Sequence, residues 1–454
     1  MRNPHVLAIP YPAQGHVIPL LKLSHELVKH GIKITFVNTD FNHNRIMKAL
    51  AGRGEVENEI RLASIPDGMG QGEDRNDLGK LTEAIMEVMP KKLEMLIKDI
   101  NLSVSDEITH IVADVSMGFA LVVAEKMGIQ RAAFWPASAS LLNMGFCIPK
   151  LLDDGIVNSD GTPTKDQMIQ LSPNMPAMRT RDFVWLRIGD LPTQKIAFNH
   201  MKRNNKTIEV VDWIVCNSTY DLEPSTFALA PEILPIGPLL ESNHIGYLAG
   251  HFWPEDSTCL NWLDQQDAHS VIYVAFGSFT IFDHTQLQEL ALGLEQSNKP
   301  FLWVLRSDVR SDANSDFLTE FEDRVSPRGK IVDWAPQQKV LSHRSIACFL
   351  SHCGWNSTME GVTNGVPFLC WPYFADQFLN ETYICDIWKV GLRLNLNEAG
   401  IFSKGEIMSK IKQLLQHGKF RATALELKTK ALNCVKEDGH SCKNLKDFID
   451  WIRA

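Results

Sequence analysis

The N-terminal region reads as a strand, a loop, a helix and a second strand in immediate succession. His5–Ile9 is a short apolar run, and the loop over residues 10–15 contains two prolines and a glycine. A helix is expected over Val17–His30, with Pro19 tolerated in its first turn, followed by an apolar strand over Ile32–Asn38. Because a strand, a helix and a strand at this spacing form a βαβ unit, the sequence predicts an α/β fold with a parallel sheet.

The same alternation recurs along the rest of the chain. The expected strands are His110–Ala113, Arg131–Trp135, Ser270–Phe276, Phe301–Arg306, Lys330–Val332, Ala347–Ser351 and Phe368–Trp371. Helices are expected near Met117–Met127 and His284–Gln296, and a further helix from Ser357. This alternation predicts two doubly wound α/β domains. The polar run Asp308–Asp316 is expected to be a solvated surface loop.

A stretch rich in proline and glycine, from Pro231 to Pro254, separates the two halves of the chain. Such a stretch is typical of a linker. The expected boundaries are an N-terminal domain over residues 1–238, a linker over 239–257, a C-terminal domain over 258–436 and a final helix over 437–454 that packs back on the N-terminal domain. Near the end, Ser403 and Glu406 have the spacing of a capping box at the start of a helix.

The composition excludes several classes of function. Lysine and arginine number 45 and aspartate and glutamate 54, which gives a formal net charge of −9. Such an acidic chain lacks the basic footprint of a nucleic-acid-binding protein and is a poor partner for anionic lipid. The 9 cysteines form no C-x-x-C pair, so we expect reduced thiols, no disulfide framework and no metal site.

The sequence also lacks the pattern of a membrane or export segment. No apolar run approaches the roughly 18 to 20 residues that span a bilayer. The apolar stretches at the N-terminus are interrupted by prolines, a glycine and histidines, whereas the apolar region of a signal peptide is unbroken. The sequence therefore predicts a soluble, cytoplasmic protein without a membrane span.

The densest pattern of chemically active residues lies between Trp334 and Gln377. Within it, residues 349–361 read F-L-S-H-C-G-W-N-S-T-M-E-G, which we interpret as a strand, a glycine loop and the start of a helix. The backbone N–H groups and partial positive charge at a helix N-terminus form a seat for a diphosphate. Four side chains could complete that seat, namely His352, Asn356 and Ser357 as donors and Glu360 as an acceptor for ribose hydroxyls.

This segment resembles the signature box of plant family 1 UDP-glycosyltransferases, the secondary-product glycosyltransferases. The box opens with W-A-P-Q, contains H-C-G-W-N-S and E-G, and closes with D-Q at the expected length. Further family motifs are P-x-Q-G-H near the N-terminus, C-N-S at 216–218, L-P-I-G-P at 234–238, W-L-D at 262–264 and V-A-F-G-S at 274–278. The resemblance implies a GT-B fold, in which two Rossmann-like domains face a cleft. The acceptor would bind on the N-terminal side and the UDP-sugar on the C-terminal side.

The resemblance also implies a role for individual residues of the donor site. Trp334 matches the position that stacks on uracil, and Gln337 the position beside the base and ribose. The other matches are Ser278, His352, Asn356 and Ser357 for the pyrophosphate, Glu360 for the ribose, and Trp355, Asp376 and Gln377 for the hexose. In the family, glutamine at the last box position goes with glucose and histidine with galactose. Gln377 therefore points to UDP-glucose, while xylose, glucuronic acid and rhamnose donors remain open.

His16 and Asp114 form a second constellation, in the N-terminal half. Each follows the carboxyl end of an expected strand, where ligands bind in open α/β sheets. An imidazole with an unperturbed pKa of about 6.5 can take a proton from an acceptor hydroxyl at neutral pH, and a carboxylate behind it would fix its tautomer. In the family these positions hold the catalytic dyad, so the resemblance implies His16 as the base and Asp114 as its partner.

These assignments imply an inverting transfer of glucose from UDP-glucose to a hydroxyl, which yields a β-glucoside. The expected acceptor is a small hydrophobic compound such as a flavonoid, another phenolic or a terpenoid. The chain has no D-x-D motif, so we expect a metal-independent enzyme that needs no cofactor besides its donor substrate. We expect a monomer.

The acceptor pocket is expected to form from loops of the N-terminal domain. Its candidate residues are Met117, Phe119, Ser138, Leu141 and Met144, which would suit an apolar ligand, although apolar residues at helical spacing also suit a core. Where many relatives have a threonine that contacts the sugar, this chain has Pro136-Ala137-Ser138. The alternatives are another UDP-sugar, an N-, S- or C-linkage, a sugar-nucleotide epimerase or hydrolase, and a non-catalytic nucleotide-sugar sensor.

Overall fold

The computed structural model describes residues 4–50, 60–103, 106–172, 175–240, 252–253, 255–307, 312–416 and 418–454. Most of the linker expected at 239–257 lies outside these residues. The chain divides into two compact units: the first comprises Met1–Trp253, Phe374–Asp376 and Leu432–Ala454, and the second Pro254–Tyr373 and Gln377–Ala431. The C-terminal segment therefore belongs to the same unit as the N-terminus.

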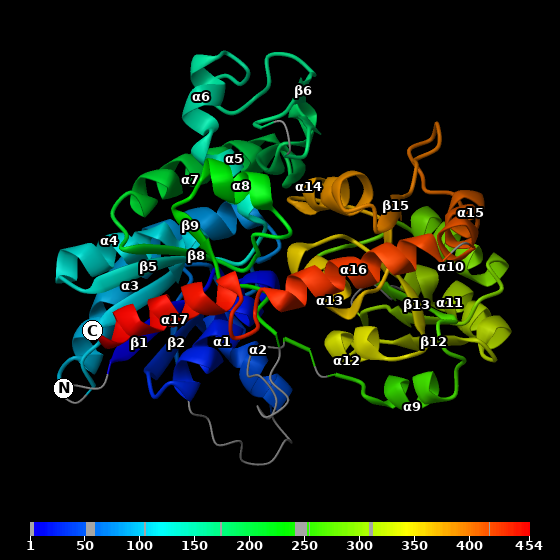
Figure 1. Cartoon of the computed structure of the whole chain (residues 1–454), viewed down its shortest axis with the longest axis horizontal. Helices are drawn as coiled ribbons and strands as arrows, with labels where there is room; N and C mark the ends of the chain where they lie inside the picture. The colour runs from blue at the N-terminus through cyan, green and yellow to red at the C-terminus, as the bar shows by residue number, and fades with distance from the viewer. Residues whose placement is uncertain are drawn as a thin grey trace. The chain divides into compact units, whose positions relative to one another are not determined.

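A seven-stranded parallel sheet forms the centre of the first unit (Figure 1). Its strands are, in spatial order, β3 (Ile60–Ile65), β2 (Lys33–Thr39), β1 (His5–Ile9), β4 (His110–Asp114), β5 (Gln130–Trp135), β8 (Trp213–Cys216) and β9 (Ile233–Pro235). The strand order reverses between β1 and β4. That reversal is where doubly wound sheets bind ligands. A separate antiparallel pair consists of β6 (Met168–Ile169) and β7 (Met178–Arg179).

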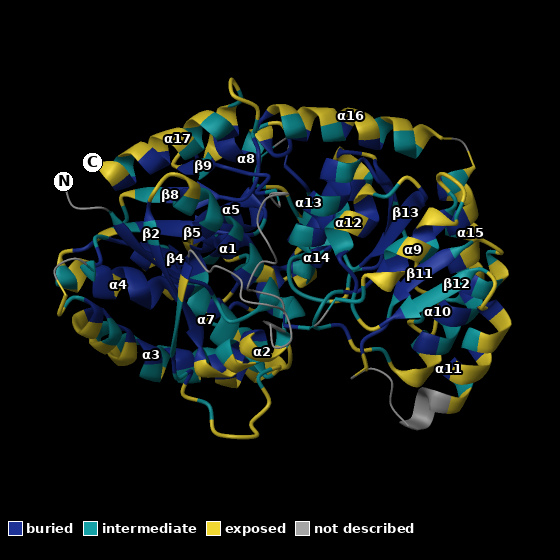
Figure 2. Cartoon of the chain, turned by 90° about the horizontal axis from the view of Figure 1, so that it is seen from below, coloured by how far each residue is buried: buried dark blue, intermediate teal, exposed yellow. Residues whose placement is uncertain are grey.

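Helices cover this sheet and turn exposed faces outward, while central strands such as β2 and β4 are buried (Figure 2). The helices are α1 (Gln14–Lys29), α2 (Asp40–Leu50), α3 (Leu78–Ile100), η2 (Val115–Met117), α4 (Gly118–Met127), α5 (Ala139–Phe146), α6 (Ile148–Asp153), η3 (Thr180–Asp182), η4 (Val184–Arg187), α7 (Leu191–Ile208), α8 (Pro224–Leu229) and α17 (His440–Arg453). Phe448 and Ile452 of α17 join the apolar cluster that contains Val6 and Phe36. Burial of these side chains therefore fastens the C-terminal helix to the first unit.

The second unit contains a six-stranded parallel sheet. Its strands are, in spatial order, β12 (Gly329–Val332), β11 (Phe301–Val304), β10 (Val271–Ala275), β13 (Ile346–Ser351), β14 (Phe368–Cys370) and β15 (Gly391–Arg393). Its helices are α9 (Thr258–Asp264), α10 (His284–Gln296), α11 (Asp312–Val325), α12 (Gln337–Ser342), α13 (Trp355–Asn364), α14 (Gln377–Thr382), η6 (Tyr383–Ile387), α15 (Lys404–Leu415) and α16 (Lys419–Asn433), the last of which belongs to this unit up to Ala431. Here the strand order reverses between β10 and β13. Two doubly wound parallel sheets confirm the predicted fold class.

The structure corrects two helix starts and confirms one cap. The carbonyl of Ala13 accepts from the N–H groups of His16 and Val17, so α1 begins at Gln14 and Pro19 lies inside the helix instead of in its first turn. Helix α13 begins at Trp355 and not at Ser357. Of the predicted capping box the Ser403 half is present, because the N–H of Glu406 donates to Ser403 Oγ at 3.3 Å, while Glu406 Oε1 accepts from the N–H and the side-chain amide of Asn395.

The expected surface loop over Asp308–Asp316 is wrong for its second part. Residues 308–311 lie outside the described residues, but α11 begins at Asp312. Leu318, Phe321 and Val325 of this helix are buried. Because their burial stabilises the whole helix, its first turn includes residues of the polar run.

Within the described part of the chain, no helix combines the length and the apolar character needed to cross a membrane.

Candidate active site

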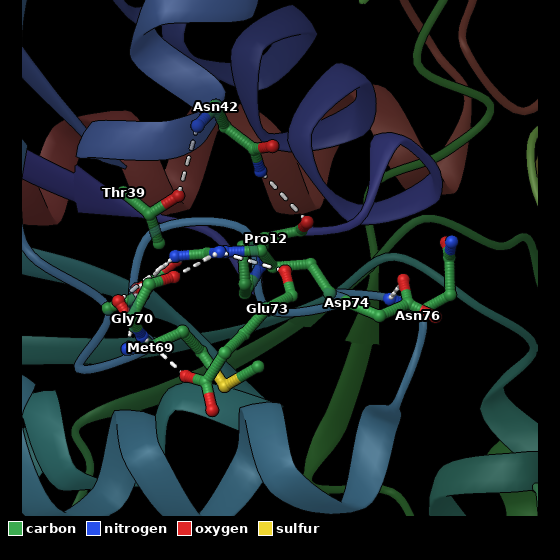
Figure 3. Close-up of polar contacts among 10 residues, drawn as sticks. Pro12, Thr39, Asn42, Met69, Gly70, Glu73, Asp74 and Asn76 are labelled. Atoms are coloured by element: carbon green, nitrogen blue, oxygen red, sulfur yellow. Dashed lines mark hydrogen bonds and ion pairs between the residues drawn. The ribbon is translucent and has the colours of Figure 1, made fainter.

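The loop that leads into His16 is held in place by its neighbours. His16 lies in the first turn of α1, just after the loop that leaves β1. Asn42 Nδ2 donates to the carbonyl of Pro12 at 2.8 Å, and the N–H of Asn42 donates to Thr39 Oγ1 at 3.2 Å (Figure 3). The end of β2 and the start of α2 therefore fix the backbone immediately before His16.

His16 and Asp114 meet at the point where the strand order of the first sheet reverses. Ile9, the last residue of β1, pairs with Ala113 of β4, so the two strands end at the same edge. His16 Nδ1 lies 2.6 Å from Asp114 Oδ2. The Asp114 side chain is 0% exposed and that of His16 is 27% exposed. A carboxylate at Nδ1 holds the proton there and leaves the lone pair on Nε2.

The surroundings of His16 act on its pKa in opposite directions. Burial lowers the pKa, whereas the charge of Asp114, its hydrogen bond and the charge of Asp376 raise it, and the net result lies above the ordinary value of 6.5. A raised pKa makes the neutral imidazole a stronger base. It also means that the ring becomes neutral only as the pH rises through a value above 6.5.

A second histidine supports this dyad and was missed in the sequence. Asp114 Oδ1 accepts from the N–H of Ser116 at 2.8 Å, and Nε2 of His200, on α7, lies 2.9 Å from the carbonyl oxygen of Ser116. Burial lowers the pKa of His200 to about 4, so the ring is neutral and its Nε2–H donates to that carbonyl. No motif marks His200, because its partner is far away in the sequence.

The five predicted acceptor residues are all buried in the first unit. They are Met117 in η2, Phe119 in α4, Ser138 at the N-cap of α5, and Leu141 and Met144 within α5. Ser138 Oγ accepts from the N–H of Leu141 at 3.2 Å. The buried carboxylate of Glu223 accepts from the N–H groups of Ala139 and Ser140 at 2.8 and 2.9 Å. The start of α5 is therefore rigidly held, and a contact of these residues with an acceptor stays a prediction.

In the second unit, two glycines make room for His352 at the reversal of strand order. Ala275 of β10 pairs with Ser351 of β13, so the loops after both strands leave from the same edge. A Cβ on Gly277, whose φ is +70°, would lie 2.7 Å from His352 Nε2, and a Cβ on Gly354 would lie 2.6 Å from the same atom. Both positions therefore need glycine for the ring to lie between them.

His352 is a neutral side chain with an unused polar atom. Burial lowers its pKa to about 4; the nearby carbonyl of Ala275 opposes this shift and the charge of Arg306 adds to it. Within the described residues, His352 Nδ1 is buried without a hydrogen-bond partner. Because an orphaned buried polar atom costs about 1–3 kcal/mol, such an atom is typical of a position that meets a ligand.

Arg306 orders the loop that carries Ser278 and was also missed in the sequence. Its side chain is buried, and it donates from Nη1 to the carbonyl of Gly277 at 2.8 Å and from Nη2 to that of Thr280 at 3.2 Å. Ser278 lies between these two anchor points. A buried guanidinium thus fixes the loop beside His352 and adds positive charge near the predicted pyrophosphate seat.

Three of the predicted donor-site residues form one hydrogen-bonded group. Gln337 Nε2 donates to Ser357 Oγ at 2.7 Å and to Glu360 Oε2 at 2.8 Å. Tyr273, which no sequence motif marks, donates from its hydroxyl to Gln337 Oε1 at 3.1 Å. The start of α12 is therefore joined to the first turns of α13 and to the central strand β10.

The remaining donor candidates lie in loops and at helix starts. Asn356 is half-buried in the first turn of α13, and the half-buried Asp376 belongs to the first unit. The carbonyl of Trp334 accepts from the N–H of Asp256 at 2.9 Å. The buried Trp355 ring lies 6.3 Å from that of Trp388. Gln377, the first residue of α14, accepts at Oε1 from the N–H of Tyr373 at 2.7 Å, which fixes the orientation of its amide.

The described residues supply no ligand group for a metal ion. Among them, no three or more histidine, cysteine, aspartate and glutamate side chains gather so that they could hold an ion. Whether the reaction needs a metal ion is decided by an activity measurement, so metal independence of the enzyme stays a prediction.

The chain is similar to known proteins over nearly its whole length. Residues 94–431 match the family described as UDP-glucoronosyl and UDP-glucosyl transferase. UDP-glycosyltransferase 83A1 of Arabidopsis thaliana is 47% identical over 100% of this chain and 98% of that protein. The 7-deoxyloganetin glucosyltransferase of Catharanthus roseus is 33% identical over 100% of this chain and 97% of that protein.

A solved structure agrees with these relatives. Phytolacca americana UGT2, in complex with UDP-2fluoro-glucose and pterostilbene, superimposes with a TM-score of 0.81 at 28% identity, over 99% of each chain. The match thus extends over both units. This chain belongs to the plant UDP-glycosyltransferase family, and it is a UDP-glycosyltransferase with the GT-B fold.

Proposed function

We propose that this enzyme is an inverting glucosyltransferase, which transfers glucose from UDP-glucose to a hydroxyl of a small hydrophobic acceptor with His16 as the base. The observation that carries the proposal is the 2.6 Å contact between His16 Nδ1 and Asp114 Oδ2. It lies at the carboxyl ends of two central strands, where doubly wound sheets bind their ligands.

The proton transfer uses the nitrogen of His16 that Asp114 does not engage. Nε2 takes the proton of the acceptor hydroxyl as its oxygen attacks the anomeric carbon of the sugar. The carboxylate of Asp114 stabilises the imidazolium that forms. The bond between the anomeric carbon and the UDP oxygen breaks on the opposite face, so an α-linked donor yields a β-glucoside.

The leaving UDP carries the charge that develops in the transition state. In this proposal the N-terminus of α13, with Asn356 and Ser357 in its first turn, supplies N–H donors and a positive dipole end to the pyrophosphate. His352, neutral because of its low pKa of about 4, donates a hydrogen bond from a ring nitrogen. Such preorganised donors stabilise a leaving group without reorganisation.

The preference for glucose rests on Gln377. The N–H of Tyr373 holds Gln377 Oε1, and this orients the amide NH₂ group as a donor for a sugar hydroxyl. We propose that Trp355 and Asp376 complete the hexose contacts. The Phytolacca americana relative, which was solved with UDP-2fluoro-glucose, supports a glucose donor over the xylose, glucuronic acid and rhamnose alternatives.

We propose that the acceptor is a terpenoid-like alcohol, with a phenol as the alternative. The first is supported by the Catharanthus roseus relative, a 7-deoxyloganetin glucosyltransferase, and the second by the pterostilbene complex of Phytolacca americana UGT2. We propose that Met117, Phe119, Ser138, Leu141 and Met144 border the acceptor. We further propose that the enzyme acts in the cytoplasm as a monomer, without a metal ion or cofactor.

The proposal is tested by measuring UDP release with a matrix of donors and acceptors. UDP-glucose, UDP-galactose, UDP-xylose and UDP-glucuronate are each combined with terpenoid alcohols and phenols, with and without EDTA, and products are identified by mass spectrometry and NMR. We expect release that depends on the acceptor, fastest with UDP-glucose and unaffected by EDTA, and a β-anomeric product. An α-anomeric product, or release that needs no acceptor, would contradict it.

A further inference from the structure

We propose that Tyr273 is a positioning residue of the donor site, which orients the side-chain amide of Gln337 and thereby the Glu360 carboxylate. The inference rests on the proposed role of Gln337 and Glu360 in holding the nucleoside of the donor. In the sequence, Tyr273 directly precedes the V-A-F-G-S segment and reads as one more strand residue. The structure gives its hydroxyl a specific partner.

The phenol ring of Tyr273 is held rigidly in the second sheet. Tyr273 lies on β10, is 1% exposed and pairs in register with Phe349 of β13. The two rings stack with their centroids 5.0 Å apart and an interplanar angle of 29°. Because the ring is buried and stacked on Phe349, the position of its hydroxyl is fixed too.

The direction of the hydrogen bond follows from the charge around it. Burial first, and then the negative charge of Glu360, raise the pKa of Tyr273 well above its ordinary value, so the phenol keeps its proton. Its hydroxyl lies 3.1 Å from Gln337 Oε1. The other end of the amide faces α13, where Nε2 contacts Ser357 Oγ at 2.7 Å and Glu360 Oε2 at 2.8 Å.

Only one orientation of the Gln337 amide satisfies all of these contacts. With the amide flipped, Oε1 would lie against the carboxylate oxygen of Glu360, and two acceptors would face each other. The Tyr273 hydroxyl stabilises the unflipped orientation by donating to Oε1. Gln337 then presents its NH₂ group to Glu360, so that the carboxylate is held in the rotamer in which it can accept from ribose hydroxyls.

Loss of the Tyr273 hydroxyl should weaken the binding of the donor and leave the chemical step unchanged. The ribose is remote from the bond that breaks, and its contacts are made equally in the ground state and in the transition state. Loss of such uniform binding raises KM and leaves kcat unchanged. A residue that merely stabilised the fold would not produce this separation, nor would it change the discrimination between ribose and 2′-deoxyribose.

The direct test is Tyr273→Phe, which removes the hydroxyl and keeps the stacked ring. We expect the Kd for UDP, measured by calorimetry, and the KM for UDP-glucose to rise about three- to tenfold, with kcat within about twofold of the wild type. The preference for UDP over 2′-deoxy-UDP should shrink by a similar factor. The control is Tyr383→Phe, which removes another buried tyrosine hydroxyl of the same unit and should leave these values unchanged.

A double-mutant cycle separates positioning from general damage. In a Gln337→Ala background, Tyr273→Phe should cause no further loss of UDP affinity, because the group that it orients is gone. An equal loss in both backgrounds, or a Tyr273→Phe variant with wild-type UDP affinity and ribose preference, would overturn the inference. If the wild type itself fails to bind UDP, the proposed function fails instead.

Discussion

Replacing Asp114 by asparagine tests the proposed catalytic dyad of His16 and Asp114 with the smallest change of shape. The two carboxylate oxygens have different partners: Oδ2 faces His16 Nδ1 at 2.6 Å and Oδ1 accepts from the N–H of Ser116 at 2.8 Å. Asparagine offers one oxygen for these two donors. If its oxygen stays with Ser116, its NH₂ group faces His16 Nδ1, and the imidazole must carry its proton on Nε2.

That tautomer cannot accept a proton from the acceptor at Nε2. The change also removes a charge-assisted hydrogen bond worth about 1.5–3 kcal/mol, which corresponds to roughly one to two pKa units. Since burial alone lowers the pKa of His16, the variant ring becomes a weaker base. Together these effects predict a fall in kcat of about 10²–10⁴-fold.

The assay is UDP release at saturating UDP-glucose and acceptor, with UDP affinity measured in parallel by calorimetry. UDP affinity should stay at the wild-type value, because Asp114 belongs to the first unit and the residues of the proposed pyrophosphate seat on α13 belong to the second. In the wild type, kcat/KM should rise with pH through a value above 6.5 as His16 loses its proton. A kcat for Asp114→Asn within about threefold of the wild type would refute this reasoning about the dyad.

Three further variants test other features of the structure. Gly277→Ala places a Cβ 2.7 Å from His352 Nε2 at a φ of +70°. The backbone strain alone costs about 1–2 kcal/mol, so we expect a lower melting temperature, and because the Cβ displaces the His352 ring we also expect weaker UDP binding. Because the pKa of His352 is about 4, the ratio of UDP affinities of wild type and His352→Gln should not change between about pH 5.5 and 8; a ratio that follows an inflection near neutral pH would contradict a neutral ring. Burial raises the pKa of Glu223 above 4.5, against its hydrogen bonds from Ser218, Ser140 and Ala139, so the stability it contributes is greatest at low pH and is lost as the pH rises. The melting temperature of the wild type relative to Glu223→Gln should therefore fall as the pH is raised from about 4.5 to 7, and a constant difference would contradict the raised pKa.

The architecture could be predicted because its determinants are local in the sequence. Apolar strand segments and proline- or glycine-containing loops sit next to the helices that they precede, as at His5–Ile9 and α1. The same logic placed His16 and Asp114 at the ends of two strands. It did not show that those strands are neighbours; that follows from the register between β1 and β4.

The supporting residues could not be predicted, because their roles depend on partners distant in the chain. Tyr273 is 64 positions from Gln337, Arg306 is 29 from Gly277, and His200 is 84 from Ser116. In the sequence these residues look like an apolar strand position, a strand end and an ordinary helix residue. Their chemistry becomes visible only when the fold brings a backbone carbonyl or a side-chain amide to them.

Two helix starts differed from the expected ones, and the start of α11 depended on long-range packing. Helix α1 begins at Gln14, three residues before the expected start, because its first turn closes locally: the carbonyl of Ala13 accepts from the N–H groups of His16 and Val17. The run near Asp312 became helical because the residues after it bury an apolar face against the second sheet. At α11 tertiary contacts therefore overrode a local preference.

The central claim, that His16 is the catalytic base, is tested most directly by acceptor-dependent UDP release in His16→Ala. The matched control is His25→Ala, which removes a second histidine from the same helix α1. We predict that His16→Ala loses at least about 10³-fold in kcat while it still binds UDP like the wild type, and that His25→Ala retains its activity. Unchanged UDP release by His16→Ala would contradict the account.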